Sequence, residues 1–172
     1  WQPFEDAPVA LAATRDEAYD RPSDPPAVRG DDDRYLAPCD RTAGGTWIGL
    51  GGSGTVAAIA NRWLDADRDG DRSRGHLVVD CLRRPTAEAA VRFVEDDVTE
   101  RTYDGFTLLV ADDVAAFRVA YDGSLAVTPL APGVHVVGNV GSVCNGRAAF
   151  SIPETRAEAG TRRADSVRRI AA

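Results

Sequence analysis

A series of short apolar segments separated by turn residues fills the second half of the chain and limits its fold to one built largely on antiparallel strands. The segments are residues 106–111, 115–121, 125–129 and 134–139. The separators are Asp112-Asp113, Asp122-Gly123 and Pro132-Gly133, all typical of tight turns. Such short connections join antiparallel strands, because parallel strands need a long crossover.

The first half adds further strand candidates. Residues 1–4 and 9–14 form two predicted strands joined by a turn at residues 5–8, and residues 46–50 and 56–61 form a predicted hairpin across a Gly-rich turn. Residues 20–40 are rich in Pro and Asp, which predicts a loop with at most a short strand at Tyr35-Leu36.

Helices are predicted at three places. The first is residues 73–82, which have an apolar face. The second is residues 86–97, for which Thr86 is a suitable N-cap. The tail, residues 153–172, is a polar, Arg-rich helix broken or softened at Gly160. Strands, then helices, then strands again indicate an α+β fold, and 172 residues suffice for one domain with its own core.

A polar cluster directly follows the small apolar segment 9–13, which we interpret as a buried strand. Thr14, Arg15, Asp16 and Glu17 occur without a break at its end. Charged groups at the end of a buried strand are costly unless they pair or contact a ligand, and binding sites are often built at strand ends. The alternative is an ordinary strand end with its charges in water.

Four sequence motifs favour the site interpretation. They are A-A-T-R-D-E at residues 12–17 with Arg21-Pro22 after it, A-G-G-T-W-I-G at 43–49, S-R-G-H-L-V at 73–78 and V-G-N at 137–139. In this order they resemble the signatures of the NRDE family, also called the transport and Golgi organisation protein 2 family. The chain departs from the family pattern at Thr14, where relatives carry Asn.

The resemblance implies the N-terminal-nucleophile hydrolase fold, in which two stacked, mostly antiparallel sheets are flanked by helices (αββα). Family members begin Met-Cys and continue past the last helix, whereas this sequence contains no Met and opens at Trp1. We therefore expect residues 1–172 to be a single NRDE-type domain that lacks the family's extreme N-terminus and its C-terminal segment. The Cys nucleophile would lie upstream of Trp1, and a chain that truly began at Trp1 would be inactive.

The resemblance also implies site residues. Arg15 and Asp16 would hold the nucleophile and the substrate, and Asn61 and Asn139 would polarise the scissile carbonyl. Fixed guanidinium and amide donors suit this chemistry because they stabilise a developing oxyanion. The expected substrate-binding residues are Thr14, Glu17 and Trp47, although a tight turn at Gly44-Gly45 with Trp47 in the core is the simpler interpretation of that segment.

Two functions remain open at this point. The first is hydrolysis of an amide or related acyl bond in a small molecule. The second is non-catalytic binding or trafficking of a small hydrophobic ligand, such as haem or an acyl lipid. No cofactor is expected, since the chain has no phosphate-loop, dinucleotide or C-x-x-C-H motif.

No metal site is expected either. Residues 65–71 imitate the first half of an EF-hand loop, but His76 stands where that loop needs a bidentate Glu. Cys39, Cys81 and Cys144 form no zinc spacing, and their odd number argues against a disulfide framework. Reduced thiols suit a cytoplasmic protein.

The charge composition bears on the source of the protein and on the classes of binding partner that are expected. All 20 basic residues are Arg, most of the 27 acidic residues are Asp, and the net charge is −7. An acidic surface without Lys favours a salt-loving archaeal source, although a GC-rich genome gives a similar composition. A nucleic-acid partner is not expected because no basic stripe exists, and no apolar run is long enough for a membrane span.

Overall fold

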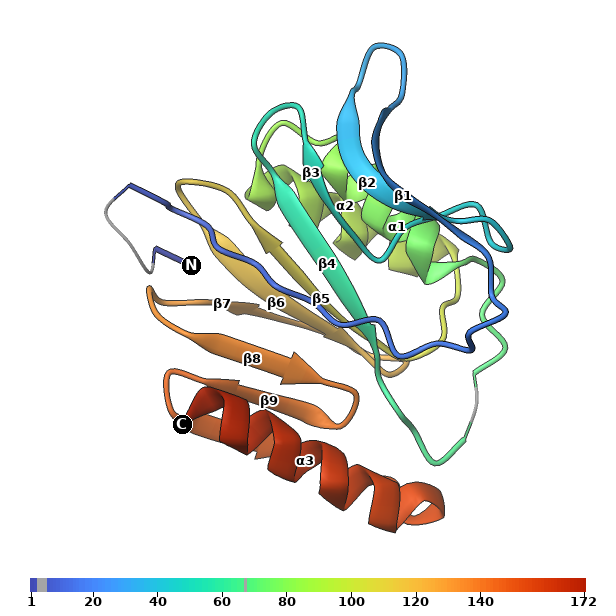
Figure 1. Ribbon diagram of the computed structural model, residues 1–172, viewed down its shortest axis with the longest axis vertical. Helices are drawn as coiled ribbons and strands as arrows, with labels where there is room; N and C mark the ends of the chain where they lie inside the picture. The colour runs from blue at the N-terminus through green and yellow to red at the C-terminus, as the bar shows by residue number, and fades with distance from the viewer. Residues whose placement is uncertain (3–5, 67) are drawn as a thin grey trace.

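The computed structural model describes residues 1–2, 6–66 and 68–172, which fold into one large sheet, one small sheet and three α-helices (Figure 1). The large sheet contains β1 (Ser23–Arg29), β2 (Tyr35–Asp40), β3 (Ile48–Gly51), β4 (Val56–Asn61), β5 (Phe106–Ala111), β6 (Ala116–Tyr121) and β7 (Leu125–Pro129). The small sheet contains β8 (His135–Gly138), β9 (Gly141–Cys144) and β10 (Arg147–Phe150). The helices are α1 (Arg74–Leu82), α2 (Ala87–Glu100) and α3 (Ala157–Ala171), and a short 3-10 turn, Glu154–Arg156, precedes α3.

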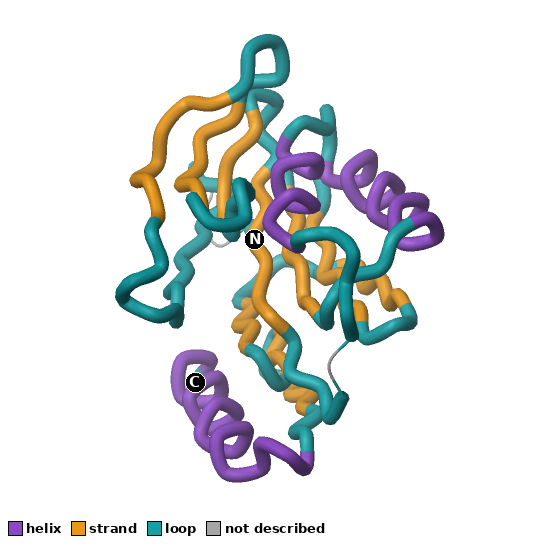
Figure 2. Tube along the Cα trace, turned by 90° about the vertical axis from the view of Figure 1, so that its right-hand side faces the viewer, coloured by secondary structure: helices purple, strands orange, loops and turns teal. Residues whose placement is uncertain are grey.

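The large sheet is an antiparallel meander whose seven strands neighbour one another in chain order. The α1–α2 pair is inserted between β4 and β5 and lies on one side of this sheet (Figure 2). Alternate strand residues such as Leu108, Val110 and Val119 are buried with the apolar face of these helices and form the core. The prediction of an α+β fold with mostly antiparallel sheets is therefore confirmed.

Side-chain caps fix where the first two helices begin. Ser73 accepts a hydrogen bond from the N–H of Gly75 at 3.2 Å, and Thr86 accepts one from the N–H of Ala89 at 3.1 Å. These hydroxyls satisfy backbone donors that the first helical turn leaves free. The predicted starts of both helices are confirmed, whereas α2 runs three residues beyond the predicted residue 97 to Glu100.

The prediction of a buried strand at residues 9–13 is wrong. The segment is irregular, four of its five residues are exposed, and no backbone hydrogen bond of the described residues pairs it with a strand. A strand needs a neighbour for its ladder, and small apolar side chains alone do not provide one. Of the strand predicted at residues 1–4, Trp1 and Gln2 are not in a strand and the remainder lies outside the described residues.

The prediction of a loop over residues 20–40 is also wrong, except that the short strand expected at Tyr35-Leu36 is the start of β2. β1 and β2 form a hairpin there, although β1 contains Pro25 and Pro26. β1 is an edge strand with a register shift between Asp24 and Ala27. Pro has no N–H to donate to a neighbouring strand. An edge strand tolerates it where the N–H would face outward or lie at a bulge, because no hydrogen bond of the sheet is lost there.

The small sheet was only partly predicted, because β9 and β10 lie beyond the last expected strand. The turn between them has Asn145 at φ 46° and Gly146 at φ 76°, the left-handed pair of a type I′ hairpin. The predicted interruption of the last helix is wrong as well. α3 continues through Gly160, which lies so close to Ile152 that a Cβ there would come within 2.4 Å of its Cγ2.

Within the described residues, no helix is both long and apolar enough to span a bilayer.

Candidate functional site

A cavity of about 610 Å³ opens where the ends of β4 and β8 meet the segment after residue 13, the loop before β3, the start of α1 and the second half of α3. All seven predicted site residues line it: Thr14, Arg15, Asp16, Glu17, Trp47, Asn61 and Asn139. They come from four separate parts of the sequence. The fold therefore brings every predicted site residue to one concavity, which we call the polar cavity.

The two asparagines are joined directly. Asn61 is the last residue of β4, and Asn139 follows β8. The Nδ2 of Asn139 donates a hydrogen bond to the main-chain oxygen of Asn61 at 2.8 Å. The backbone N–H of Trp63 in turn donates to the main-chain oxygen of Asn139 at 2.9 Å. These two bonds tie the end of the large sheet to the end of the small sheet at the cavity.

Arg15 is the most enclosed of the predicted charged residues, with 22% of its side chain exposed. Its guanidinium carbon lies 4.5 Å from the centre of the Trp47 ring, a cation–π contact. Its Nη2 lies 3.6 Å from Asp40 Oδ2, but that nitrogen is buried and makes no hydrogen bond with the described residues. The stacked ring and the carboxylate hold the guanidinium plane while leaving a donor unused.

Asp40, at the end of β2, is a site residue that the sequence argument missed. Its Oδ2 accepts a hydrogen bond from Arg21 Nε at 2.8 Å, and its Oδ1 accepts from the N–H groups of Thr42 and Ala43 at 2.9 and 3.2 Å. Burial alone raises the pKa of Asp40, but these hydrogen bonds outweigh burial and hold the pKa below its usual range. The bond to Asp40 also raises the pKa of Arg21.

A signal for Asp40 was present in the sequence. Asp40 is a charged residue that directly follows the mostly apolar segment Tyr-Leu-Ala-Pro-Cys. Residues 14–17 were assigned to the site because they follow an apolar segment in the same way. The expected strand was only Tyr35-Leu36, whereas β2 continues to Asp40, so the prediction did not place Asp40 at a strand end.

Two of the sequence motifs meet through their glycines. Gly44 has φ +74°, which provides the turn before β3, and Gly45 lies against the backbone of Gly75. A Cβ on Gly45 would come within 2.4 Å of the Gly75 carbonyl carbon. The N–H of Thr46 donates to the oxygen of Gly75 at 3.2 Å. The turn predicted at Gly44-Gly45 is present, and the close backbone approach places Trp47 and the start of α1 around the same cavity.

The remaining predicted residues lie at the exposed rim. Asp16 is 60% exposed and forms an ion pair with Arg163 of α3. Glu17 Oε2 lies 3.7 Å from Arg21 Nη1, and the side chain of Thr14 is exposed. Asp16 therefore links the segment after residue 13 to α3 across the cavity mouth.

Arg74, in the S-R-G motif, is a second residue that the sequence argument did not assign to the site. Burial lowers its pKa, the nearby Asp104 carboxylate raises it, and the positive charge of Arg21 lowers it further. Its Nη1 donates to the oxygen of Gly105 at 3.0 Å, and its Nη2 lies 3.8 Å from Asp104. The cavity wall thus holds a cation whose counter-ion is distant and half exposed.

The described lining of the polar cavity contains no thiol and no imidazole. Cys81 lies on the buried face of α1, and burial raises the pKa of its thiol to about 12, which suits a packing role. Hydroxyls are present, but Thr46 donates to Ile48 and Ser73 caps α1. The described lining therefore offers hydrogen-bond donors and carboxylates, but no thiol or imidazole.

The comparisons with known proteins give the family. The family model described as Transport and Golgi organisation 2 matches residues 1–163. The Transport and Golgi organization 2 homolog of Mus musculus is 32% identical over 60% of this chain and 38% of its own length. The homologues of Homo sapiens and Bos taurus are 36% and 30% identical, over 60% and 76% of this chain.

The chain spans half or less of the length of these relatives, namely 38%, 38% and 50%. Among solved structures, the penicillin V acylase of Agrobacterium tumefaciens is similar at a TM-score of 0.43 and 19% identity, over 57% of this chain and 33% of that one. On the match of the family model over residues 1–163, the chain belongs to the Transport and Golgi organisation 2 family.

Proposed function

We propose that the polar cavity is the site where a longer form of this protein hydrolyses an amide or related acyl bond by an N-terminal-nucleophile mechanism. The observation that carries the proposal is the convergence of Arg15, Asp16, Asn61 and Asn139 on one cavity from distant parts of the chain. A cysteine N-terminal to Trp1 would supply the nucleophile, and its α-amine would act as the base.

Each side chain has a defined role in this proposal. The unused donor of Arg15 would bind the substrate, held in place by Trp47 and Asp40. The amides of Asn61 and Asn139 would stabilise the oxyanion that forms when the thiolate attacks the carbonyl. Asn139 is already fixed by its bond to Asn61, so its orientation needs no reorganisation during the reaction.

The rim residues would complete the site. Asp16 would orient the α-amine of the nucleophile, because a carboxylate accepts hydrogen bonds from an ammonium group. Thr14 and Glu17, together with the face of Trp47, would contact the substrate. Asp40 would act as a positioning residue for Arg15 and Arg21.

A second candidate function is non-catalytic binding of a small hydrophobic ligand, such as haem or an acyl lipid. The absence of a thiol and an imidazole from the described lining favours binding over catalysis by these residues, and the lack of a common axial ligand for haem iron favours an acyl lipid over haem. Under this proposal the same arginines and asparagines would bind a polar end of the ligand without attacking it.

The test uses the full-length protein and a panel of amide and ester substrates. Arg15→Ala should abolish turnover or ligand binding. Arg29→Ala is the matched control, because Arg29 is 27% exposed, pairs with Asp24 and does not line the cavity. Replacing the N-terminal Cys by Ala separates the two functions, since it should remove turnover but not binding in the enzyme and change nothing in the carrier. Equal activity of the Arg15→Ala and Arg29→Ala variants would refute both proposals.

A further inference from the structure

Arg74, the first residue of α1, lies where a positive charge is electrostatically unfavourable. The N-terminus of a helix carries a partial positive charge, and the first turn of α1 contains no acidic residue to offset it. Burial lowers the pKa of Arg74, and the positive charge of Arg21 lowers it further. The position is therefore a costly one for a cation unless an anion approaches it.

The guanidinium of Arg74 has few partners within the protein. Its Nη1 donates a hydrogen bond to the oxygen of Gly105 at 3.0 Å. Asp104, at 3.8 Å from Nη2, is the one carboxylate that pairs with it among the described residues, and Asp104 is 50% exposed, so water screens this pair. A guanidinium has more N–H donors than these contacts use. Arg74 thus retains donors and charge for another partner.

Most other arginines of the polar cavity are already bonded to carboxylates. Arg21, Arg72 and Arg163 each donate a hydrogen bond to an aspartate. Among the described residues, Arg15 and Arg74 donate none to a carboxylate. Arg15 is assigned above to the substrate, and Arg74 is a second guanidinium in the cavity wall that is able to bind an anion.

We propose that the substrate of the polar cavity carries an anionic group of the carboxylate type and that Arg74 binds this group. The substrate class, which rests on the proposed function, is then an amide or related acyl compound that bears a carboxylate. A planar guanidinium matches a carboxylate because two parallel N–H···O bonds can form between them. The partial positive charge at the start of α1 adds to the attraction.

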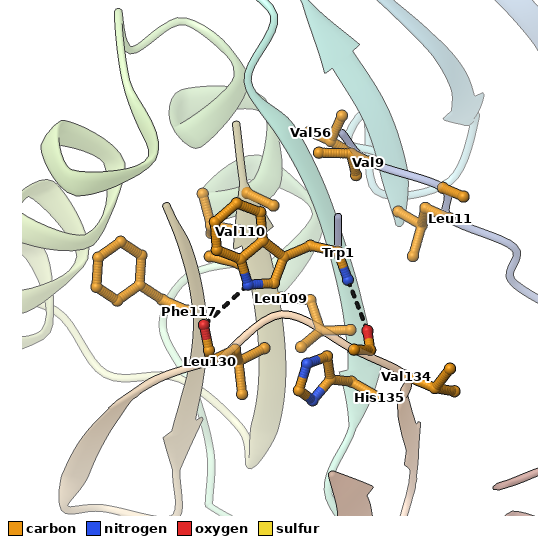
Figure 3. A pocket seen from close by; sticks show the side chains of 14 residues that line it. Trp1, Val9, Leu11, Val56, Leu109, Val110, Phe117, Leu130, Val134 and His135 are labelled. Atoms are coloured by element: carbon orange, nitrogen blue, oxygen red, sulfur yellow. Dashed lines mark hydrogen bonds between the residues drawn. The ribbon is translucent and has the colours of Figure 1, made fainter. Parts of the chain in front are cut away.

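A second concavity, of about 270 Å³, has a different wall and shares no lining residue with the polar cavity. Figure 3 shows the rings of Trp1 and Phe117 and aliphatic side chains such as Leu109 in this wall. No arginine is among its described lining residues. A carboxylate that binds to Arg74 should therefore leave the signals of this second wall unchanged.

The test is an NMR titration of the full-length protein with hexanoylglycine and with hexanoylglycinamide, a neutral analogue of nearly the same shape. We expect hexanoylglycine to bind at least about tenfold more tightly, because hydrogen bonds between two charged groups are stronger than those to a neutral amide. The shifted amide signals should include residues 73–76 and exclude residues 109–117.

Two matched variants assign the preference to one arginine. Arg74→Gln removes the charge, and Arg29→Gln is its control. Arg29 is 27% exposed, donates to the oxygen of Ala37 and lies 4.0 Å from Asp24, but it does not line the cavity. The preference for hexanoylglycine should be lost in Arg74→Gln and kept in Arg29→Gln. If Arg74→Gln does not fold, the map of shifted amides in the unmodified protein decides.

Three results would overturn the proposal: equal binding of the two probes, a preference that survives in Arg74→Gln, or shifts specific to hexanoylglycine at residues 109–117. Release of hexanoate, followed in the same samples, separates this proposal from the proposed function. Turnover of both probes with equal affinity would support hydrolysis and refute the anion site. A preference for hexanoylglycine without turnover would support the anion site and count against hydrolysis.

Discussion

The Nδ2 of Asn139 donates a hydrogen bond to the main-chain oxygen of Asn61, which is 2.8 Å away and 78 residues earlier in the chain. The bond joins the end of β4 in the large sheet to the end of β8 in the small sheet. It uses the side chain of one asparagine but only the backbone of the other. The two residues should therefore respond differently to mutation.

Asn139→Ala should lower the free energy of unfolding by about 1 kcal/mol, because the bond between the sheets is lost. Asn61→Ala should change it by less than about 0.5 kcal/mol, since the accepting carbonyl remains. In the full-length protein both variants should reduce turnover. Urea denaturation and a rate measurement check the pair, and an equal loss of stability in the two variants would contradict the proposed role of the bond.

Asp40→Asn should destabilise the protein by about 1–2 kcal/mol at pH 7, because charge-assisted bonds from Arg21 are weakened. The pKa of Asp40 is lowered in the folded protein. Its contribution is therefore present above the ordinary pKa of an aspartate, about 4, and is lost as pH falls through the folded pKa.

The difference between Asp40→Asn and the unmodified protein should accordingly disappear in acid. Denaturation curves at a series of pH values measure it. Asp24→Asn is the control, because Asp24 is 46% exposed and pairs with Arg29 and Arg41 only at 4.0 and 3.9 Å. If the difference in free energy of unfolding did not change with pH, the stabilisation would not come from the charge of the Asp40 carboxylate.

Gly45→Ala should cost about 3 kcal/mol, because a Cβ there would come within 2.4 Å of the Gly75 backbone, which cannot move independently of α1. Gly54→Ala is the control for backbone strain alone, since Gly54 has φ +93° and open space around its Cβ position. Its expected cost is about 1–2 kcal/mol. Thermal unfolding of both variants gives the comparison, and a cost for Gly45→Ala no greater than that of the control would argue against tight packing of the two motifs.

The acidic loop at residues 65–71 should not bind calcium with micromolar affinity, because the closing Glu of an EF-hand is absent. Two of its carboxylates have other partners: Asp65 accepts a hydrogen bond from Thr155 and Asp71 accepts one from Thr102. Asp67 lies outside the described residues. Calorimetric titration with calcium chloride is the measurement, and saturation at micromolar calcium would show the prediction to be wrong.

The elements that the sequence predicted well are those whose signals are local. β5 and β7 have the predicted bounds, and β6 begins one residue later. Their turns contain Asp and Gly, which form tight turns without help from the rest of the chain. The N-caps Ser73 and Thr86 are likewise local, since a hydroxyl binds an N–H two or three residues ahead.

The failures involve contacts between distant residues. Residues 9–13 have a strand-like composition but no partner strand among the described residues. β1 contains two prolines and still pairs, because its place at the sheet edge removes the penalty. Gly160 does not end α3, since its missing side chain makes room for Ile152. Whether a strand lies at the sheet edge, and whether a glycine is close to a distant side chain, depends on the whole fold. A short stretch of sequence does not contain this information.

The candidate site also has features that depend on the sequence alone and features that depend on the tertiary structure. The sequence by itself determined which polar residues stand at the ends of apolar runs and which motifs the chain carries, because both depend on the order of residues alone. Only the tertiary structure decided that Arg15, Trp47, Asn61 and Asn139 share one cavity, and that Asp40 and Arg74 belong with them. The physical reason is that the cavity forms where two sheets meet the start of α1 and the second half of α3. The register and packing that bring these parts together are fixed by long-range burial of apolar side chains.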